Sequence, residues 1–476
     1  MRRWWWVSVV AGGLLVFALH FRPWEGGLLE DWETGNQWAQ HGWGALPDSM
    51  RIYHTGRPLH FLLYYFGLWL ANGSFVGGYL MLGLVAAGQF AAVLWALRPV
   101  SGSRWLSLGI ALLIGLNPLW GVGYVLRFFP SQVMTLALFV SAGLLIRYAR
   151  SGRWPFLLGS ALVQLYGLLT YQAAAVVWIV AAVALALAVG AGWRRTVLAG
   201  AVSLACSAAV AAYSFAIAPL INPSSYETVS RELGGGSIVG PVTAVRQLLG
   251  TIIGQLPYVL LAIVLLVVLA AVLHLTGSIR TRQAWLIVGL ALGSPLAGLA
   301  YINTMFWLSD AERVANTTSL TIAIALLVWA IGSTGRHPRL ELIAAGAGVA
   351  GSIALVGVAI ANWAGYAAVQ QRVLAIVEPA VREATGDETV VVVDHSGVLG
   401  DTYTLLSAFH LTQATQLTFG DPTEDVLCTS DEVPVRHFLP ACGDLEIDGE
   451  PADFAAMTPA GGGDIPGGRI DVYIAR

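Results

Sequence analysis

The sequence has no lysine, so all 25 of its basic residues are arginine. Charge of either sign is scarce, because Asp, Glu, Lys and Arg together make up 11% of the 476 residues, against about 25% in soluble domains. Hydrophobic residues make up 57%. A chain this apolar cannot cover a water-facing surface, so its composition excludes a series of soluble domains and indicates that most of it lies in lipid.

Cysteine and net charge are also low. Three cysteines in the whole chain exclude a small protein held together by disulfides. The formal net charge of −3 provides no general attraction to a polyanion, so nucleic acid is not an expected partner. The informative question is where the few charged residues fall along the chain.

Eleven apolar runs are long enough to cross a bilayer, which requires about 17–25 residues per helix. The first run, 4–20, follows Arg2 and Arg3 and precedes no small-residue cleavage site, which predicts an uncleaved signal anchor. The other ten runs lie near 75–97, 105–121, 131–147, 155–171, 173–193, 196–219, 251–275, 284–302, 315–333 and 341–364.

The arginines predict the topology of these spans. Thirteen of them lie at the N-terminus or in every second connection, together with a single acid, Glu341, whereas the other 27 of the 28 acids lie in the remaining connections and the tail. Arginine is enriched in cytoplasmic loops. We therefore expect an α-helical polytopic protein of the plasma membrane, with about 11 transmembrane helices, a cytoplasmic N-terminus and an extracytoplasmic C-terminal part.

One further apolar run, 58–71, is not counted as a span. It has 14 residues, and counting it would invert every later loop and move the arginine clusters outside. We therefore predict an interfacial or re-entrant helix over 58–72 on the outer surface. A twelfth span is the alternative.

The chain changes character at about residue 367. The tail carries 18 acids and five arginines, and its apolar residues alternate with polar ones. The pattern predicts a helix over 370–385, a buried strand over 389–394, a helix over 402–412 and a last strand over 469–475. We expect a membrane domain over 1–366 and a small extracytoplasmic α/β domain over 367–476, serving as a structural or acceptor-docking module.

Two of the three cysteines, Cys428 and Cys442, lie in this tail. An oxidising compartment favours a disulfide between them.

The first outer loop, 22–57, contains an acidic pair, Glu30-Asp31, among several tryptophans. Tryptophan favours the headgroup region of a membrane, so its presence is expected there. Carboxylates beside lipid lose solvation unless they are paired or used. The pair therefore indicates a functional site, with a solvated turn as the alternative.

Three short motifs in outer loops accompany the acidic pair: Thr55-Gly56-Arg57-Pro58, Arg127-Phe128-Phe129-Pro130 and Leu169-Thr170-Tyr171-Gln172. With the signal anchor and the many spans, they make residues 1–365 similar to the GT-C superfamily of membrane glycosyltransferases, and more narrowly to the Gtr-type glucosyltransferases that decorate bacterial surface polysaccharide. Where that family often has two adjacent aspartates, this chain has Glu30-Asp31.

The resemblance implies a polyprenyl-phosphate-linked sugar as donor, a glycan, lipid or protein hydroxyl as acceptor, and inversion at the sugar. It implies that Asp31 is the general base and that Glu30 is its partner or a metal ligand, because the attacking hydroxyl must lose a proton. Which of the two acids is the base stays open. The resemblance leaves Mg²⁺ or Mn²⁺ as the one cofactor to consider.

Arginine binds phosphate bidentately, so the resemblance implies donor-phosphate contacts at Arg57, Arg127 and Arg313. An ion pair with lipid phosphate for Arg127, and one within its own turn for Arg313, are the alternatives. Tyr171, Gln172 and His54 are candidate substrate contacts. Capping of a span is the alternative for Tyr171 and Gln172, and an ordinary structural role is the alternative for His54.

Two other functions fit a polytopic protein with outer arginines. A lipid-linked polysaccharide polymerase or ligase would have its largest outer loop between late spans, whereas the charged loop here is the first. A transporter or flippase would carry ionisable residues or broken helices at mid-membrane, and these spans are almost free of charge.

Overall fold

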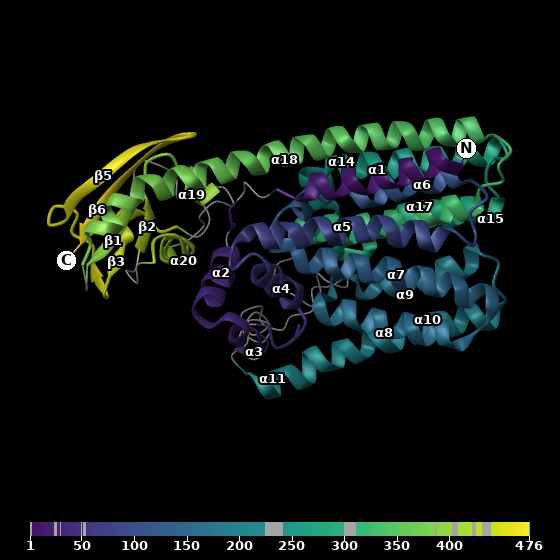
Figure 1. The fold of residues 1–476 in the computed structure, drawn as a ribbon, viewed down its shortest axis with the longest axis horizontal. Helices are drawn as coiled ribbons and strands as arrows, with labels where there is room; N and C mark the ends of the chain where they lie inside the picture. The colour runs from purple at the N-terminus through teal and green to yellow at the C-terminus, as the bar shows by residue number, and fades with distance from the viewer. Residues whose placement is uncertain are drawn as a thin grey trace.

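The structure, a computed structural model, describes residues 2–22, 26–28, 30–48, 50, 54–223, 241–298, 311–385, 388–401, 408–420, 425–430 and 439–475. Long helices run side by side in a bundle, and a small α/β domain lies beyond one end of it (Figure 1). The N-terminus lies at the opposite end (Figure 1).

A helix occurs at each of the eleven predicted spans. They are α1 Arg2–His20, α5 Phe75–Leu97, α6 Arg104–Leu116, α7 Phe129–Ser151, α8 Trp154–Thr170, α9 Ala175–Ala188, α10 Trp193–Ala212, α14 Pro257–Leu275, α15 Thr281–Gly293, α17 Ala311–Gly332 and α18 Pro338–Glu383. Within the described residues, seven helical segments are long and apolar enough to cross a membrane. The fold is that of a helical membrane protein, and the count of eleven spans stays a prediction.

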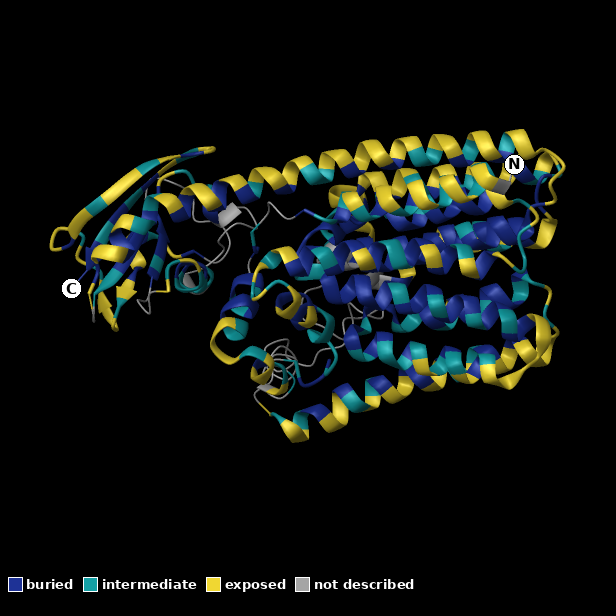
Figure 2. Ribbon diagram, in the orientation of Figure 1, coloured by how far each residue is buried: buried dark blue, intermediate teal, exposed yellow. Residues whose placement is uncertain are grey.

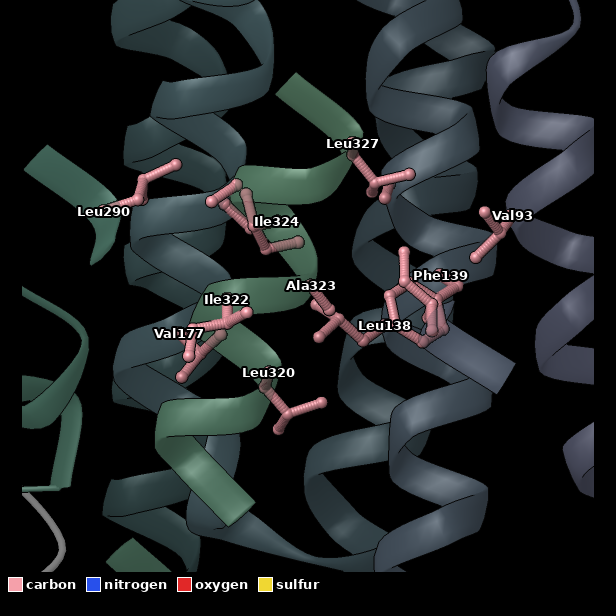
Figure 3. Packing of buried hydrophobic residues seen from close by; sticks show 14 of the residues in the cluster. Val93, Leu138, Phe139, Val177, Leu290, Leu320, Ile322, Ala323, Ile324 and Leu327 are labelled. Carbon is pink, nitrogen blue, oxygen red and sulfur yellow. The ribbon is translucent and has the colours of Figure 1, made fainter. Parts of the chain in front are cut away.

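Burial separates central helices from peripheral ones. In the apolar segments of α7 and α17, 83% and 94% of the residues are buried. In that of α18 only 17% of the residues are buried, and the outer face of this helix is exposed (Figure 2). Around α17, Leu320, Ile324 and Leu327 meet side chains of α5, α7, α9 and α15 (Figure 3). Apolar side chains therefore both fill the bundle and cover its outside, as a lipid-embedded protein requires.

Arginines gather at the end of the bundle that holds the N-terminus, here called the arginine end. They bind carbonyl groups of neighbouring helix ends: Arg195 donates to the carbonyls of Ala149 and Arg150 at 3.1 Å, and Arg150 donates to that of Pro99. These carbonyls have no partner within their own helix, so arginine satisfies them. The predicted arginine-rich loops thus meet one another in space.

Helix α18 is longer than any membrane requires. Its 46 residues extend about 69 Å at 1.5 Å per residue, against a hydrocarbon core of about 30 Å. The sequence predicts a span over 341–364 and a separate helix over 370–385; in the structure both belong to α18. The intervening residues, 365–369, contain two alanines and no proline, so none of them ends the helix. The predicted boundary at 366 therefore falls inside one continuous helix.

The C-terminal domain contains a four-stranded sheet in the order β2-β1-β6-β5. Its strands are β1 Thr389–Asp394, β2 Asp425–Thr429, β5 Thr458–Ile465 and β6 Gly468–Ala475. Strand β1 pairs with β2 in parallel and with β6 antiparallel. A short hairpin, β3 Glu446–Ile447 and β4 Glu450–Pro451, lies beside the sheet, together with helices α19 Val398–Asp401 and α20 Ala408–Phe419.

Strand β1 forms where the sequence predicts it, and it is buried on both faces. Val390 and Val392 face one apolar cluster, and Val391 and Val393 face another, as the two-residue period of a strand requires. Cys428 of β2 and Cys442 form a disulfide. Residues 402–407 of the predicted helix 402–412 lie outside the described residues, and the rest of it belongs to α20, Ala408–Phe419.

Candidate active site

The first outer loop folds into helix α2, Glu30–His41, at the end of the bundle opposite the arginine end (Figure 1). Its first turn carries Glu30, Asp31 and Glu33. The N-terminus of a helix presents unpaired N–H groups and a partial positive charge, so acids are stabilised there. This explains why an acidic pair begins a helix instead of forming a solvated turn.

Asp31 is almost completely buried, with 1% of its surface exposed. The backbone N–H of Leu28 donates to its Oδ2 at 3.1 Å, and the hydroxyl of Tyr64 donates to its Oδ1 at 3.0 Å. Burial raises the pKa of Asp31 to about 7, although both hydrogen bonds act to lower it. A carboxyl group with this pKa exchanges protons readily near neutral pH.

Tyr64 belongs to helix α4, Leu62–Leu70, inside the predicted interfacial segment 58–72. A helix of nine residues is about 14 Å long, roughly half the hydrocarbon thickness. Its buried face packs with Tyr79 and Leu82 of α5 in one apolar cluster. Helix α4 therefore lies against the bundle and holds Asp31 through Tyr64.

Arg127 faces the acidic turn. Its Nε lies 2.8 Å from Oε2 of Glu30, and both side chains are partly exposed. Arg127 belongs to a short 3-10 helix, Leu126–Phe128, that leads directly into α7 at Phe129–Pro130. The predicted acid and one predicted phosphate-binding arginine thus lie side by side.

The segment from His54 to His60 is held from two sides. Gln172 and Ser214 both donate to the carbonyl of Gly56, Ser214 at 3.0 Å, and Tyr213 donates to the carbonyl of Thr55 at 3.0 Å. The motifs at 55–58 and 169–172 therefore meet in space. Gln172 fixes the backbone beside Arg57, and its role as a substrate contact stays a prediction.

Two of those contacts come from residues that the sequence reasoning missed. Tyr213 and Ser214 begin a π-helical turn, Tyr213–Ile217, at the outer end of α10. Such turns often occur at functional sites. A Tyr-Ser pair inside an apolar span was the available signal, because a polar pair in a span requires partners.

Aromatic stacking orders the side chains of this segment. The rings of His54 and His60 lie 4.5 Å apart and nearly parallel. The guanidinium of Arg57, 6% exposed, lies 5.7 Å from the ring centre of Tyr171. Burial lowers the pKa of both histidines well below the usual value, and Arg57 acts in the same direction. The histidines are therefore neutral at neutral pH.

Many of these side chains line one cavity of about 250 Å³. Its acids, here called the acidic wall, are Glu30, Asp31 and Glu33 from α2. Its arginines and histidines are His54, Arg57, His60 and Arg127. The remaining lining residues are Thr34, Gln37, Phe61, Phe128, Pro130, Ser131 and Tyr171.

Most of the predicted site residues thus come together. Glu30, Asp31, His54, Arg57, Arg127 and Tyr171 line the cavity. Arg313 lies in the first turn of α17, and its side chain lies outside the described residues. His60 and Glu33 also line the cavity, although neither is among the predicted site residues. Burial and the neighbouring Glu30 raise the pKa of Glu33 to about 7.

A metal ion was considered at Glu30. Across the described part of the chain, no group of three or more His, Cys, Asp or Glu side chains is arranged to hold a metal ion. Glu30 is instead paired with Arg127. Mg²⁺ or Mn²⁺ therefore stays a prediction of the sequence, and the reaction below is derived without it.

Compared with models of known protein families and with curated protein sequences, the chain matches none. The similarity to the GT-C superfamily therefore rests on the short motifs and their order. The function must be argued from the cavity itself.

Proposed function

We propose that the chain is an inverting membrane glycosyltransferase of the GT-C type. It transfers a sugar from a polyprenyl-phosphate-linked donor to a hydroxyl of a cell-surface glycan, lipid or protein on the outer face. The observation that carries the proposal is the cavity, where a buried carboxyl group of raised pKa faces two arginines. The carboxyl group can accept the proton of an attacking hydroxyl, and the arginines can stabilise a departing phosphate.

In the proposed reaction the acceptor oxygen attacks the anomeric carbon and the bond from that carbon to the phosphate oxygen breaks. The hydroxyl proton passes to Asp31, and the phosphate leaves with the bonding electrons. Tyr64 and the Leu28 amide orient the carboxylate, and each carboxylate oxygen has a second lone pair to accept the proton. A base with a pKa near the working pH is suited to this step.

Arg57 and Arg127 would stabilise the negative charge that develops on the phosphate. Arg127 contacts Glu30 through Nε, and this ion pair fixes the direction of its guanidinium. Glu30 therefore acts as a support that aims Arg127 across the cavity. The histidines, kept neutral, would add polar contacts without adding charge.

A second cavity supports a lipid-linked donor. It has a volume of about 490 Å³ and lies between α6, α7, α14, α17 and α18. Its walls are almost entirely apolar, with Leu113, Leu266 and Leu320 among them. A hydrocarbon chain is the ligand that such walls favour.

The proposed topology has eleven spans, a cytoplasmic N-terminus and an extracytoplasmic C-terminal domain. The arginines that cap helix ends at the arginine end support this orientation, since cytoplasmic loops are rich in arginine. The cavity would then open at the outer face, where the acceptor is found.

The test replaces Asp31 in the full-length protein. Asp31→Asn keeps the shape and removes the base, so transfer should fall by at least about 10²-fold, the scale of general base catalysis. The measurement is glycan analysis of cells carrying each variant, with membrane levels of the protein matched. Glu378→Gln, in an exposed ion pair of α18, is the control and should transfer normally. Normal transfer by Asp31→Asn would exclude the assigned role.

A further inference from the structure

The acidic helix α2 shares an apolar core with the C-terminal domain. Trp32, which lies between Asp31 and Glu33, is 7% exposed and belongs to the cluster that contains Val373 and Val377 of α18. Its ring also meets that of Phe75 edge-on at 5.2 Å. The residue next to the proposed base is therefore held by the tail of the protein.

Helix α20 of that domain lies directly against α2. Asn36 donates to Oε1 of Gln413 at 2.8 Å and to Oε1 of Gln416 at 2.9 Å. A Cβ atom at Gly35 would lie 2.7 Å from the side chain of Leu417, closer than real contacts allow. The glycine thus permits the close approach of the two helices.

Thr34 and Gln37, which flank Gly35 and Asn36 on α2, line the active-site cavity. The turn of α2 that contacts α20 therefore also borders the cavity.

We propose that the C-terminal domain is a positioning element of the active site. Helix α20 fixes α2, and with it Asp31 and the Glu30–Arg127 pair. This inference rests on the proposed transfer reaction. It gives the tail a role in the chemistry, beyond the structural or docking role expected from its sequence.

The experiment removes the partners of Asn36 with the double variant Gln413→Ala/Gln416→Ala, in the full-length protein in lipid nanodiscs. Hydrogen exchange of the α2 amides should become about tenfold faster and sugar transfer about tenfold slower, the scale of lost buried hydrogen bonds. Glu378→Gln, on the exposed side of α18, should change neither.

The two readouts separate the possible failures. Faster exchange with normal transfer would overturn the positioning role, and unchanged exchange would show that α20 does not hold α2. Absence of transfer by the wild-type protein would overturn the proposed function and this role in it. The exchange data would then still report whether the two helices are docked.

Discussion

Arginine is used differently at the two ends of the bundle. At the arginine end, Arg150 and Arg195 donate to backbone carbonyls of neighbouring helix ends. At the other end, Arg57 and Arg127 line a cavity together with three acids. The first arrangement completes hydrogen bonds that helix ends leave open, and the second concentrates opposite charges around an enclosed volume. Arginine content alone therefore does not identify a phosphate site; the surroundings do.

The largest expected effect tests this contrast directly. Arg57→Gln or Arg127→Gln should lower sugar transfer by about 10²-fold or more, the scale of losing a charged group aimed at the transition state. Arg195→Gln, the matched change at the arginine end, should leave transfer within about twofold. Transfer assays in membrane vesicles with matched protein levels measure all three. Equal losses of transfer in Arg195→Gln and in the two cavity variants would show that arginine has the same role at both ends of the bundle.

The pH dependence of transfer sharpens the role of the acidic wall. Because the pKa of Asp31 is about 7, the ionised base is a minor species at pH 6 and dominant at pH 8. The rate should therefore rise about tenfold over that interval. Glu33 has a similar pKa, so Glu33→Gln serves as the control and should keep the rise. A profile that flattens only in Glu33→Gln would assign the base to Glu33.

The raised pKa of Asp31 also affects the stability of the fold, in the direction opposite to its effect on the transfer rate. The folded protein binds the proton of Asp31 more tightly than the unfolded chain, whose carboxyl pKa is near its ordinary value. This contribution to stability is complete at acid pH and is lost as the pH rises to about 7. Below about pH 7, activity therefore rises with pH while this part of stability falls.

A smaller effect is expected from the support of the base. Tyr64→Phe removes the hydrogen bond to Asp31 that lowers its pKa, at little change in shape. Transfer at pH 7 should fall about fivefold, and the midpoint of the pH profile should move to higher pH. An unchanged midpoint with reduced rate would mean that Tyr64 acts only in packing.

The smallest effect concerns the acid at the arginine end. Glu341 is buried and accepts a hydrogen bond from Ser333 at both carboxylate oxygens, at 2.8 and 2.7 Å. Glu341→Gln should leave transfer within about twofold, because it keeps an acceptor for Ser333 far from the cavity. Thermal unfolding of the purified protein would provide the companion measurement. A large loss of transfer with normal stability would contradict the view that the arginine end is structural and that the reaction takes place at the other end.

Much of the membrane part could be predicted from the sequence. Long apolar runs mark the helices because a helix that crosses lipid must be apolar, and the arginine pattern predicts which helix ends lie on the same side of the membrane. The outer motifs could be paired with the acidic turn because topology puts them on one face. Gln172 shows the limit of that reasoning, since a polar residue beside a site can equally bind backbone, here the carbonyl of Gly56.

Features that depend on distant contacts could not be predicted. Strand β5 contains Gly461, Gly462 and Gly463 and lacks the apolar alternation of a strand, yet it pairs with β6. Trp32 looked like any interfacial tryptophan, because its burial depends on residues more than 300 positions later. The continuity of α18 was hidden by the change from apolar to mixed composition, which alters the environment of a helix without ending it.

The contact between α2 and α20 joins the beginning of the chain to its end. Asn36 and Gln413 are 377 residues apart. A ribosome adds about 5–20 residues per second, so about 20–75 s pass between the synthesis of one partner and the other. During that time the first outer loop is exported without the helix that will hold it. A chain truncated before residue 408 would lack the helix that contacts α2, so it should lose the proposed sugar transfer even where it reaches the membrane.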